Sequence, residues 1–282
     1  MNLELKDAVK AIKPLSPALV TLLGVTASAE HSLNDVLKVI QFDSVLTAKL
    51  LQAANSAAFR RSQEVESVSM AVTLLGERFV VGMAMDLCSD GFFEQPLAGY
   101  ESAAGDLWRH SIKTALAARL VCRYARVPVD SNQAFTGGIL HDIGKVVLST
   151  FLEGAARGMA LAALEGHFSY LEAEREKLGG DHCEAGDALA VQWRLPACYR
   201  AVIAWHHSPD GAPEALVPLV YAVHLGDALA MMSGAGTGSD SLLYPLNPRH
   251  QDFFDLSSES VQRVLLDLEN EFAMITDSMA ST

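Results

Sequence analysis

The sequence predicts an all-α protein, and three observations support this class. Apolar residues recur at spacings of three and four along most of the chain, as they do on one face of a helix. The strict alternation of apolar and polar residues that is typical of strands is scarce. Half of the 282 residues are hydrophobic and 20 % are charged, a composition that excludes a mainly disordered chain.

Five apolar stripes mark the expected helices in chain order. A capping pattern of Ser32 and Asp35 precedes the first, Gly76 interrupts the third, and the fourth begins near Gly105. The stripes consist of Val36, Leu37 and Ile40; Leu46, Leu50 and Leu51; Val68, Val72, Leu75 and Phe79; Trp108, Ile112, Leu116 and Leu120; and Val261, Val264, Leu265, Leu268, Phe272 and Ile275.

Two segments rich in glycine, proline or serine interrupt the helical pattern. Residues 88–105 predict a boundary between an N-terminal helical lobe, residues 1–95, and a larger lobe, residues 96–282. Residues 233–250 predict a long surface loop, after which Ser257 and Ser258 cap the last helix. The length agrees with two domains of roughly 150 residues each, or with one large domain.

Charge and cysteine content narrow the class of protein. With 21 basic and 34 acidic side chains the formal net charge is −13, which argues against broad binding of nucleic-acid polymers. Four scattered cysteines without a Cys-x-x-Cys pair are expected to be buried thiols rather than disulfides or zinc ligands. The N-terminus carries no apolar leader pattern, so we expect a cytoplasmic protein.

One apolar stretch, residues 215–238, has the length of a membrane span. Pro218, His224 and Asp227 lie in its middle, where ionisable groups are costly in lipid. We therefore predict a buried helix and no membrane contact.

The candidate functional residues are centred on the adjacent pair His141-Asp142, which is followed by Ile-Gly-Lys145. Glycines on both sides of the pair allow the backbone to approach closely. Imidazole nitrogens and carboxylate oxygens together suit first-row divalent metals. The remaining candidates, in chain order, are His110, His182, His206, His207 and Asp227.

The order of these residues resembles that of the HD superfamily of metal-dependent phosphohydrolases. Five segments together resemble one branch of it, the HDOD domain, over roughly residues 14–230. They are Asp43–Ser56, Ser67–Gly76, Trp108-Arg-His110-Ser111, Gly138-Ile-Leu-His-Asp-Ile-Gly-Lys145 and Asp181-His182-Cys-Glu-Ala-Gly186. The resemblance implies a bacterial signalling protein with a two-lobe, multi-helix architecture around an HD-type helical core.

The resemblance also implies a role for each candidate residue. It predicts one or two divalent ions of iron, manganese, nickel or zinc, and Asp142 would bridge the two. Asp142 and Lys145 are the predicted catalytic residues, because Lys145 matches the lysine that approaches a substrate phosphate. The implied metal ligands are His110, His141, Asp142, His182, His206, His207 and Asp227.

One departure from the related HD-GYP phosphodiesterases bears on activity. Those proteins carry a Gly-Tyr-Pro motif after the double histidine, whereas this chain has Ser208-Pro-Asp-Gly-Ala-Pro213. The sequence therefore lacks the motif that would most specifically indicate hydrolysis of a cyclic dinucleotide.

Two classes of function remain, and we favour the first. The first is an HDOD-type regulatory protein that acts through a protein partner and retains a metal centre. The second is an active metal-dependent phosphohydrolase whose ligand is a phosphoester or nucleotide. A di-iron oxygenase is a third and weaker alternative, because the same ligands can hold a redox pair.

Simpler interpretations compete at single residues. His110 would be a packed helix histidine, the pair His206-His207 would favour a helix C-terminus, and Lys145 would be a surface cation. Asp227 needs a partner, since an unpaired carboxylate in an apolar helix is costly. His224, one turn earlier, would orient Asp227 or simply pack beside it.

Overall fold

The computed structural model describes residues 1–41, 43–56, 59, 65–88, 91–166 and 168–280. Within these ranges the chain is helical and has no β-strand, with two isolated bridges only, Leu97 with Ser102 and Ala125 with Phe254. The predicted all-α class is confirmed.

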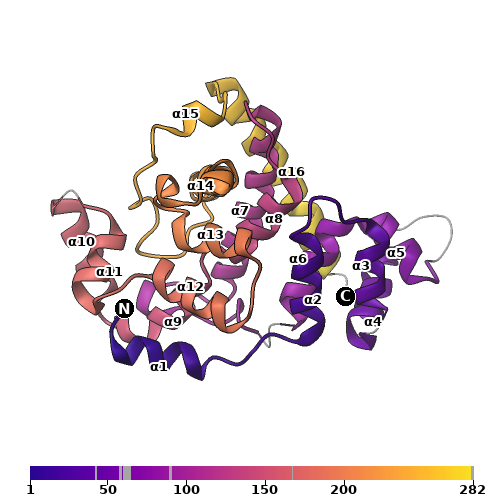
Figure 1. Cartoon of the computed structure of the whole chain (residues 1–282), viewed down its shortest axis with the longest axis horizontal. Helices are drawn as coiled ribbons and strands as arrows, with labels where there is room; N and C mark the ends of the chain where they lie inside the picture. Colours follow the sequence, from indigo (N-terminus) through magenta and orange to yellow (C-terminus); the bar gives the residue numbers. More distant parts are fainter. Residues whose placement is uncertain (42, 57–58, 60–64, 89–90, 167, 281–282) are drawn as a thin grey trace.

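Six helices precede the first predicted break. Helices α2 to α6 form one group, whereas α1 lies apart from them beside α12 (Figure 1). The indole of Trp193 donates to the carbonyl of Lys13 and the amide of Gln192 to that of Ile12, which fixes the end of α1 there. The six are α1 (Leu3–Ala11), α2 (Pro17–Thr26), α3 (Leu33–Ile40), α4 (Ser44–Ala54), α5 (Val68–Leu75) and α6 (Glu77–Cys88).

The predicted helix cap at Ser32 and the predicted helix break at Gly76 are both present in the N-terminal helices. The main-chain N–H and the hydroxyl of Ser32 both donate to Asp35 Oδ2, at 3.1 and 2.7 Å, and so begin α3. Gly76 has a φ of +81°, in the left-handed region that glycine adopts freely, and it separates α5 from α6.

Within the described residues, ten α-helices and four short 3-10 helices follow. Figure 1 shows α14 near the centre of the molecule, and α10 with α11 at the side opposite α2 to α6. The segments are η1 (Ala98–Tyr100), α7 (Asp106–Val121), η2 (Cys122–Tyr124), α8 (Ser131–Leu140), α9 (Ile143–Leu152), α10 (Ala156–Gly166), α11 (Tyr170–Leu178), α12 (His182–Gln192), α13 (Ala197–Trp205), η3 (Pro209–Gly211), η4 (Glu214–Leu216), α14 (Val217–Met232), α15 (His250–Phe253) and α16 (Ser258–Ala280).

The apolar stretch predicted to be buried is helix α14. By length and composition alone, residues Glu214–Met232 qualify as a membrane span, as do two strongly bent helix pairs. Within the fold, however, 67 % of the most apolar window of Glu214–Met232 is buried, and α14 packs along α7. Gly226 makes this contact close, since a Cβ there would lie 2.7 Å from the amide nitrogen of Ala118.

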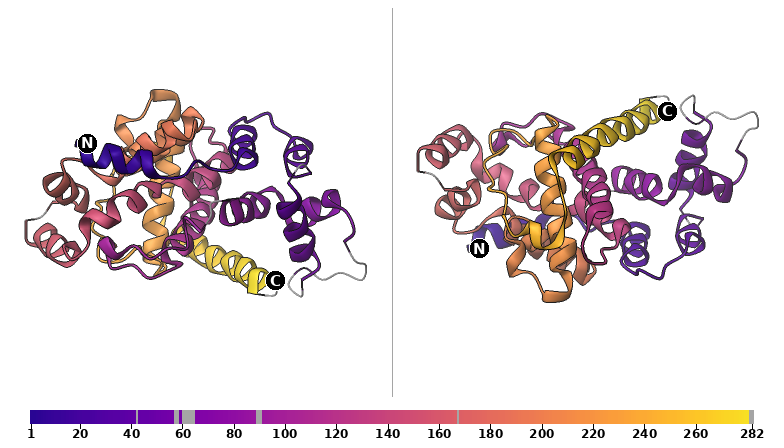
Figure 2. Two further views of the ribbon diagram at one scale, coloured as in Figure 1. Left: turned by 90° about the horizontal axis from the view of Figure 1, so that it is seen from below. Right: turned by 90° about the horizontal axis from the view of Figure 1, so that it is seen from above.

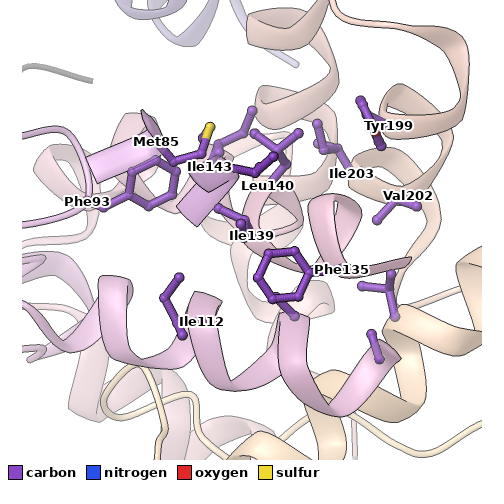
Figure 3. Close-up of a cluster of buried hydrophobic side chains, with 14 of the residues drawn as sticks. Met85, Phe93, Ile112, Phe135, Ile139, Leu140, Ile143, Tyr199, Val202 and Ile203 are labelled. Atoms are coloured by element: carbon purple, nitrogen blue, oxygen red, sulfur yellow. The ribbon is translucent and has the colours of Figure 1, made fainter. Parts of the chain in front are cut away.

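A continuous hydrophobic core joins the two predicted lobes. Figure 3 shows Met85 of α6 and Phe93 beside side chains of α8 and α9, above Ile112 of α7. The core continues to α13 through Tyr199 and its neighbours. The exact boundary between residues 95 and 96 stays a prediction.

Helix α16 begins at its predicted cap, where the amide of Ser260 donates to the hydroxyl of Ser257 at 3.1 Å. It packs along α7 and runs out toward the N-terminal helices, as both views of Figure 2 show. Its acidic residues pair with basic residues of α7, for example Glu269 with Lys113 and Glu271 with Arg119.

The prediction of a surface loop over residues 233–250 is wrong in one important respect. Residues 233–249 connect α14 to α15 without regular structure, but Thr237 and Asp240 are only 1 % and 0 % exposed. These side chains enter the interior because polar groups of the candidate site bind them. We call residues 233–249 the strap.

Candidate metal centre

Six helices bring the seven predicted ligands together in the interior. His110 lies in α7, His141 and Asp142 form the junction of α8 and α9, and His182 begins α12. Of the remaining three, His206 and His207 directly follow α13, and Asp227 lies in α14. Six of the seven are at most 3 % exposed, and the side chain of His207 is 5 % exposed.

Glycines allow the helices to approach closely enough for this convergence. A Cβ at Gly144 would lie 1.8 Å from the carbonyl oxygen of His182, so α9 touches the backbone of α12. A Cβ at Gly138 would lie 2.5 Å from the Cα of Ala115 in α7. The predicted role of these glycines therefore has a geometric basis at both positions.

The first group of donors consists of His110, His141 and Asp142. The two Nε2 atoms lie 3.2 Å apart, and they lie 3.5 and 3.4 Å from Asp142 Oδ2. The Nδ1 atoms of His110 and His141 donate to the carbonyls of Ala235 and Gly138, at 2.7 and 2.8 Å. Both Nε2 atoms consequently point toward one centre, as in histidine ligands oriented by a backbone carbonyl.

Asp227 completes this first group. Its Oδ1 lies 3.2 Å from His110 Nε2 and 3.8 Å from His141 Nε2. The partner that the carboxylate requires in its apolar helix is therefore the group of candidate ligands itself.

The second group consists of Asp142, His182, His206 and His207. The Nε2 atoms of His182 and His206 both lie 3.5 Å from Asp142 Oδ1. Their Nδ1 atoms are engaged elsewhere, with Glu174 Oε2 at 2.8 Å and the carbonyl of Ile203 at 3.0 Å. Asp142 thus directs one carboxylate oxygen toward each group.

Unpaired buried atoms show that a cation fits between these donors. Among the described residues, five buried atoms of the candidate ligands lack a hydrogen-bond partner, although Lys145 forms an ion pair with Asp142. These atoms are both oxygens of Asp142, Nε2 of His182 and both ring nitrogens of His207. Buried polar atoms are nearly always satisfied in folded proteins. Imidazole and carboxylate atoms that converge and remain unpaired match the requirements of a divalent ion.

The electrostatics of the centre keep several donors in the form that binds a metal. Burial lowers the pKa of His141 to about 3 and that of His207 well below its usual value, so both rings are neutral. Burial alone would raise the pKa of Asp142, but the ammonium of Lys145 and the imidazole of His206 hold it well below its ordinary range. Similarly, His110 outweighs burial and lowers the pKa of Asp227 to about 2.

Raised pKa values favour protonation of the other three histidines of the centre, His110, His182 and His206, when no metal is present. Burial opposes protonation of His110, but the carboxylate of Asp227 raises its pKa. Glu174 raises the pKa of His182 in the same way, and Cys183 with Asp142 raises that of His206 to about 10. A metal would have to displace these protons, so metal binding is linked to proton release.

Lys145 is not the surface cation of the simpler interpretation. It is 2 % exposed, and its Nζ lies 2.8 Å from Asp142 Oδ2 and 2.7 Å from Asp240 Oδ2. Burial would lower its pKa, but Asp142 and Asp240 outweigh burial and raise it. The side chain is therefore a permanent buried cation.

Several residues of the site escaped the sequence analysis. Glu174 binds both the ring and the main-chain N–H of His182, yet it lies in a charged helix typical of a solvated face. Asp240, Tyr244 and Thr237 belong to the strap, whose composition indicates a surface loop.

Of the two alternatives for His224, a bond to Asp227 or simple packing, the bond to Asp227 is not formed. Its Nδ1 donates to the carbonyl of His206 at 2.7 Å, and its Nε2 accepts from the amide of Asn247 at 2.9 Å. It therefore supports the backbone of one candidate ligand and the end of the strap.

Comparisons with known proteins identify the family and the fold. A family model described as the HDOD domain matches residues 12–209. An uncharacterised protein of Treponema pallidum (strain Nichols) is 26 % identical over 226 residues, 77 % of this chain. The match covers 42 % of that protein, so the chain spans about two-fifths of the length of this curated relative.

Two solved structures share the fold. A protein of Marinobacter aquaeolei VT8, provisionally assigned to signal transduction, has a TM-score of 0.74 at 18 % identity, covering 99 % of this chain and 65 % of the other. A protein of Shewanella amazonensis SB2B, provisionally assigned as a phosphohydrolase, has a TM-score of 0.65 at 22 % identity, covering 98 % and 97 %. At these identities the likeness shows the fold alone.

Proposed function

The chain belongs to the HDOD domain family, and from this premise we propose that it is a regulatory protein of signal transduction built around a divalent-metal centre. The observation that carries the proposal is the position of Asp142, which faces one donor group with each of its carboxylate oxygens. The name of the Marinobacter neighbour favours the same role.

The donor chemistry favours particular metals. Five imidazoles and two carboxylates suit iron, manganese, nickel or zinc better than magnesium, which prefers oxygen ligands. One ion would take His110, His141, Asp142 and Asp227, and a second would take Asp142, His182, His206 and His207. When bound, such ions supply Lewis-acid polarisation of a phosphoryl oxygen and of water.

An active phosphohydrolase is the second candidate function. The complete ligand set and the buried charge of Lys145 favour it, as does the name of the Shewanella neighbour. In such an enzyme Lys145 would hold a phosphate anion by its charge, and its raised pKa makes it a poor proton donor at neutral pH. Residues 208–213, without Gly-Tyr-Pro, argue against a cyclic dinucleotide as the substrate.

The N-terminal helices are the proposed surface for a protein partner. Helices α2 to α6 contribute none of the seven candidate ligands, so another role must account for them. We place the partner there and the phosphoester or nucleotide ligand, if one binds, at the metal centre. A cytoplasmic location remains our expectation.

Metal removal tests the central proposal. Because an ion that binds only the folded state adds stability, we expect chelation to lower the Tm by several degrees, and reloading to restore it. Elemental analysis and thermal unfolding of the purified protein measure both effects. A metal content below about 0.1 equivalent, with an unchanged Tm after chelation, would contradict the proposal.

The metal-loaded protein is expected to hydrolyse cyclic di-GMP at less than about 0.1 s⁻¹, below the usual enzyme range. The physical reason is the missing Gly-Tyr-Pro segment after His207. Any turnover of a simple phosphomonoester should require added metal and disappear in Lys145→Met. Faster hydrolysis of cyclic di-GMP would favour the enzyme over the regulatory protein.

A further inference from the structure

The strap covers the candidate metal centre from the end of α14 to the start of α15. Its first part is firmly fixed: the carbonyl of Ala235 accepts from His110, and the amide of Ser239 donates to the carbonyl of Tyr100 at 2.8 Å. Its outer residues Leu242 and Leu246 are 65 % and 46 % exposed. The strap therefore has one face in solvent and one face inside the site.

The inner face of the strap places a carboxylate in an anion-binding site. Asp240 is fully buried, and its Oδ2 lies 2.7 Å from Lys145 Nζ and accepts from the hydroxyl of Tyr244 at 2.8 Å. The hydroxyl of Thr237 donates to Asp240 Oδ1 at 3.0 Å. Of these donors the ammonium of Lys145 lies outside the strap, and an ammonium is a donor that binds a phosphate group.

Tyr244 shields the second group of candidate ligands. Its ring stacks on that of His207, with centroids 3.8 Å apart and planes at 13°, and lies 5.7 Å from the ring of His182. The candidate ligands of both donor groups and Lys145 are buried in this conformation.

The far end of the strap is held by a latch of exposed polar contacts. Asn247 donates to Asp210 Oδ2 at 3.0 Å, and Arg249, the last residue of the strap, pairs with Asp210 Oδ1 at 2.8 Å. Exposed ion pairs of this kind contribute little stability, so the latch holds this end weakly beside the bond from the main-chain amide of Asn247 to His224. Between the fixed part and the latch, Leu242 has a φ of +62°, which is strained for a residue other than glycine.

We propose that the strap is an internal competitor for the ligand of this site, with Asp240 in the position of a phosphate group. The inference rests on the proposed metal-dependent, phosphoester-binding function of the centre. Lys145 already faces Asp142 and Asp240, so an incoming phosphate must displace Asp240 before it can use the lysine. Release of the latch then opens the centre.

Inorganic phosphate is the probe for this competition. Calorimetry should show that Asp240→Asn, loaded with metal, binds phosphate at least about tenfold more tightly than the wild type. The added substitution Lys145→Met should remove that gain. The control Asp255→Asn changes an exposed carboxylate that pairs with Arg126 outside the strap, and it should match the wild type. Equal phosphate affinity of folded, metal-loaded Asp240→Asn and wild type would overturn the proposal.

Hydrogen exchange of the strap gives a second measurement that needs no metal. In Asp240→Asn the amides of Leu243 and Asn247 should exchange faster than in the wild type, whereas Asp255→Asn should not change them. If the wild type binds no metal, the proposed function fails, but this comparison still decides whether Asp240 holds the strap closed. Unchanged exchange in Asp240→Asn would overturn the proposal for the strap.

Two milder variants address a failure of Asp240→Asn to fold. Tyr244→Phe removes only the hydroxyl that binds Asp240, and Arg249→Ala removes the ion pair of the latch. Both should accelerate exchange in the strap. Wild-type exchange rates in both variants would overturn the proposal.

Discussion

Asp142→Ala is expected to release every bound divalent ion from the protein. The carboxylate lies within 3.5 Å of four imidazole nitrogens, two in each donor group, so no other residue can replace it in both. The substitution removes one negative charge and two oxygen donors from a site that is closed to solvent. We therefore expect the metal content to fall from stoichiometric to below about a tenth of an equivalent.

His224→Ala is the matched control for this loss. The ring of His224 is buried and close to the centre, but it binds the carbonyl of His206 and the amide of Asn247 rather than a metal-facing atom. Losses of such supporting contacts weaken metal affinity by about 10–100-fold, so at saturating metal this variant should remain loaded. Full metal content in Asp142→Ala would show that the centre is wrongly assigned.

Both variants should remain helical by circular dichroism. The core that unites α6 to α9 and α13 is apolar and does not include the candidate ligands. If Asp142→Ala unfolds instead, the metal is an essential structural element, and the hydrolase alternative becomes weaker.

The helices were predictable because their signals are local. The bond pattern of Ser32 with Asp35 and the break at Gly76 each depend on residues only a few positions apart. The residues of the centre could be named because adjacent His141 and Asp142 form a recognisable motif, although only the fold reveals that the two oxygens of Asp142 face different groups.

The supporting residues were not predictable because their partners are distant or their surroundings misleading. Asp240 meets Lys145 across nearly a hundred positions, and its segment has the polar, glycine-rich composition of an exposed loop. Glu174 lies among other charged residues of α11, so nothing local distinguishes it. For His224, the spacing of three from Asp227 suggested a contact, but its ring turns toward α13 and the strap.

Gly144→Ala is expected to cause the other large effect, a loss of both stability and metal. The added Cβ would lie 1.8 Å from the carbonyl oxygen of His182 and 2.6 Å from the amide nitrogen of Gly186. Both are backbone atoms, so no side-chain rotation can relieve the overlap, and α9 must move away from α12. Overpacking of this kind costs about 1–3 kcal/mol or more, which exceeds the gain of about 1 kcal/mol in helix propensity.

Gly158→Ala in α10 separates this steric effect from helix propensity. A Cβ at Gly158 would meet no atom within 4 Å, so the same substitution should stabilise the protein by about 0.5–1 kcal/mol. Thermal unfolding should therefore show opposite shifts in Tm for the two variants. A Tm of Gly144→Ala at or above that of the wild type would contradict the close contact of α9 and α12.

The metal content of Gly144→Ala connects packing to the chemistry of the site. Asp142 precedes Gly144 by two residues, and His182 begins the helix that the new methyl group would push away. The 3.5 Å separation of His182 Nε2 from Asp142 Oδ1 must therefore grow when the helices part. Because a metal site tolerates only a few tenths of an ångström in its ligand distances, the second donor group should lose its ion first, while His110 and Asp227 remain in place on α7 and α14.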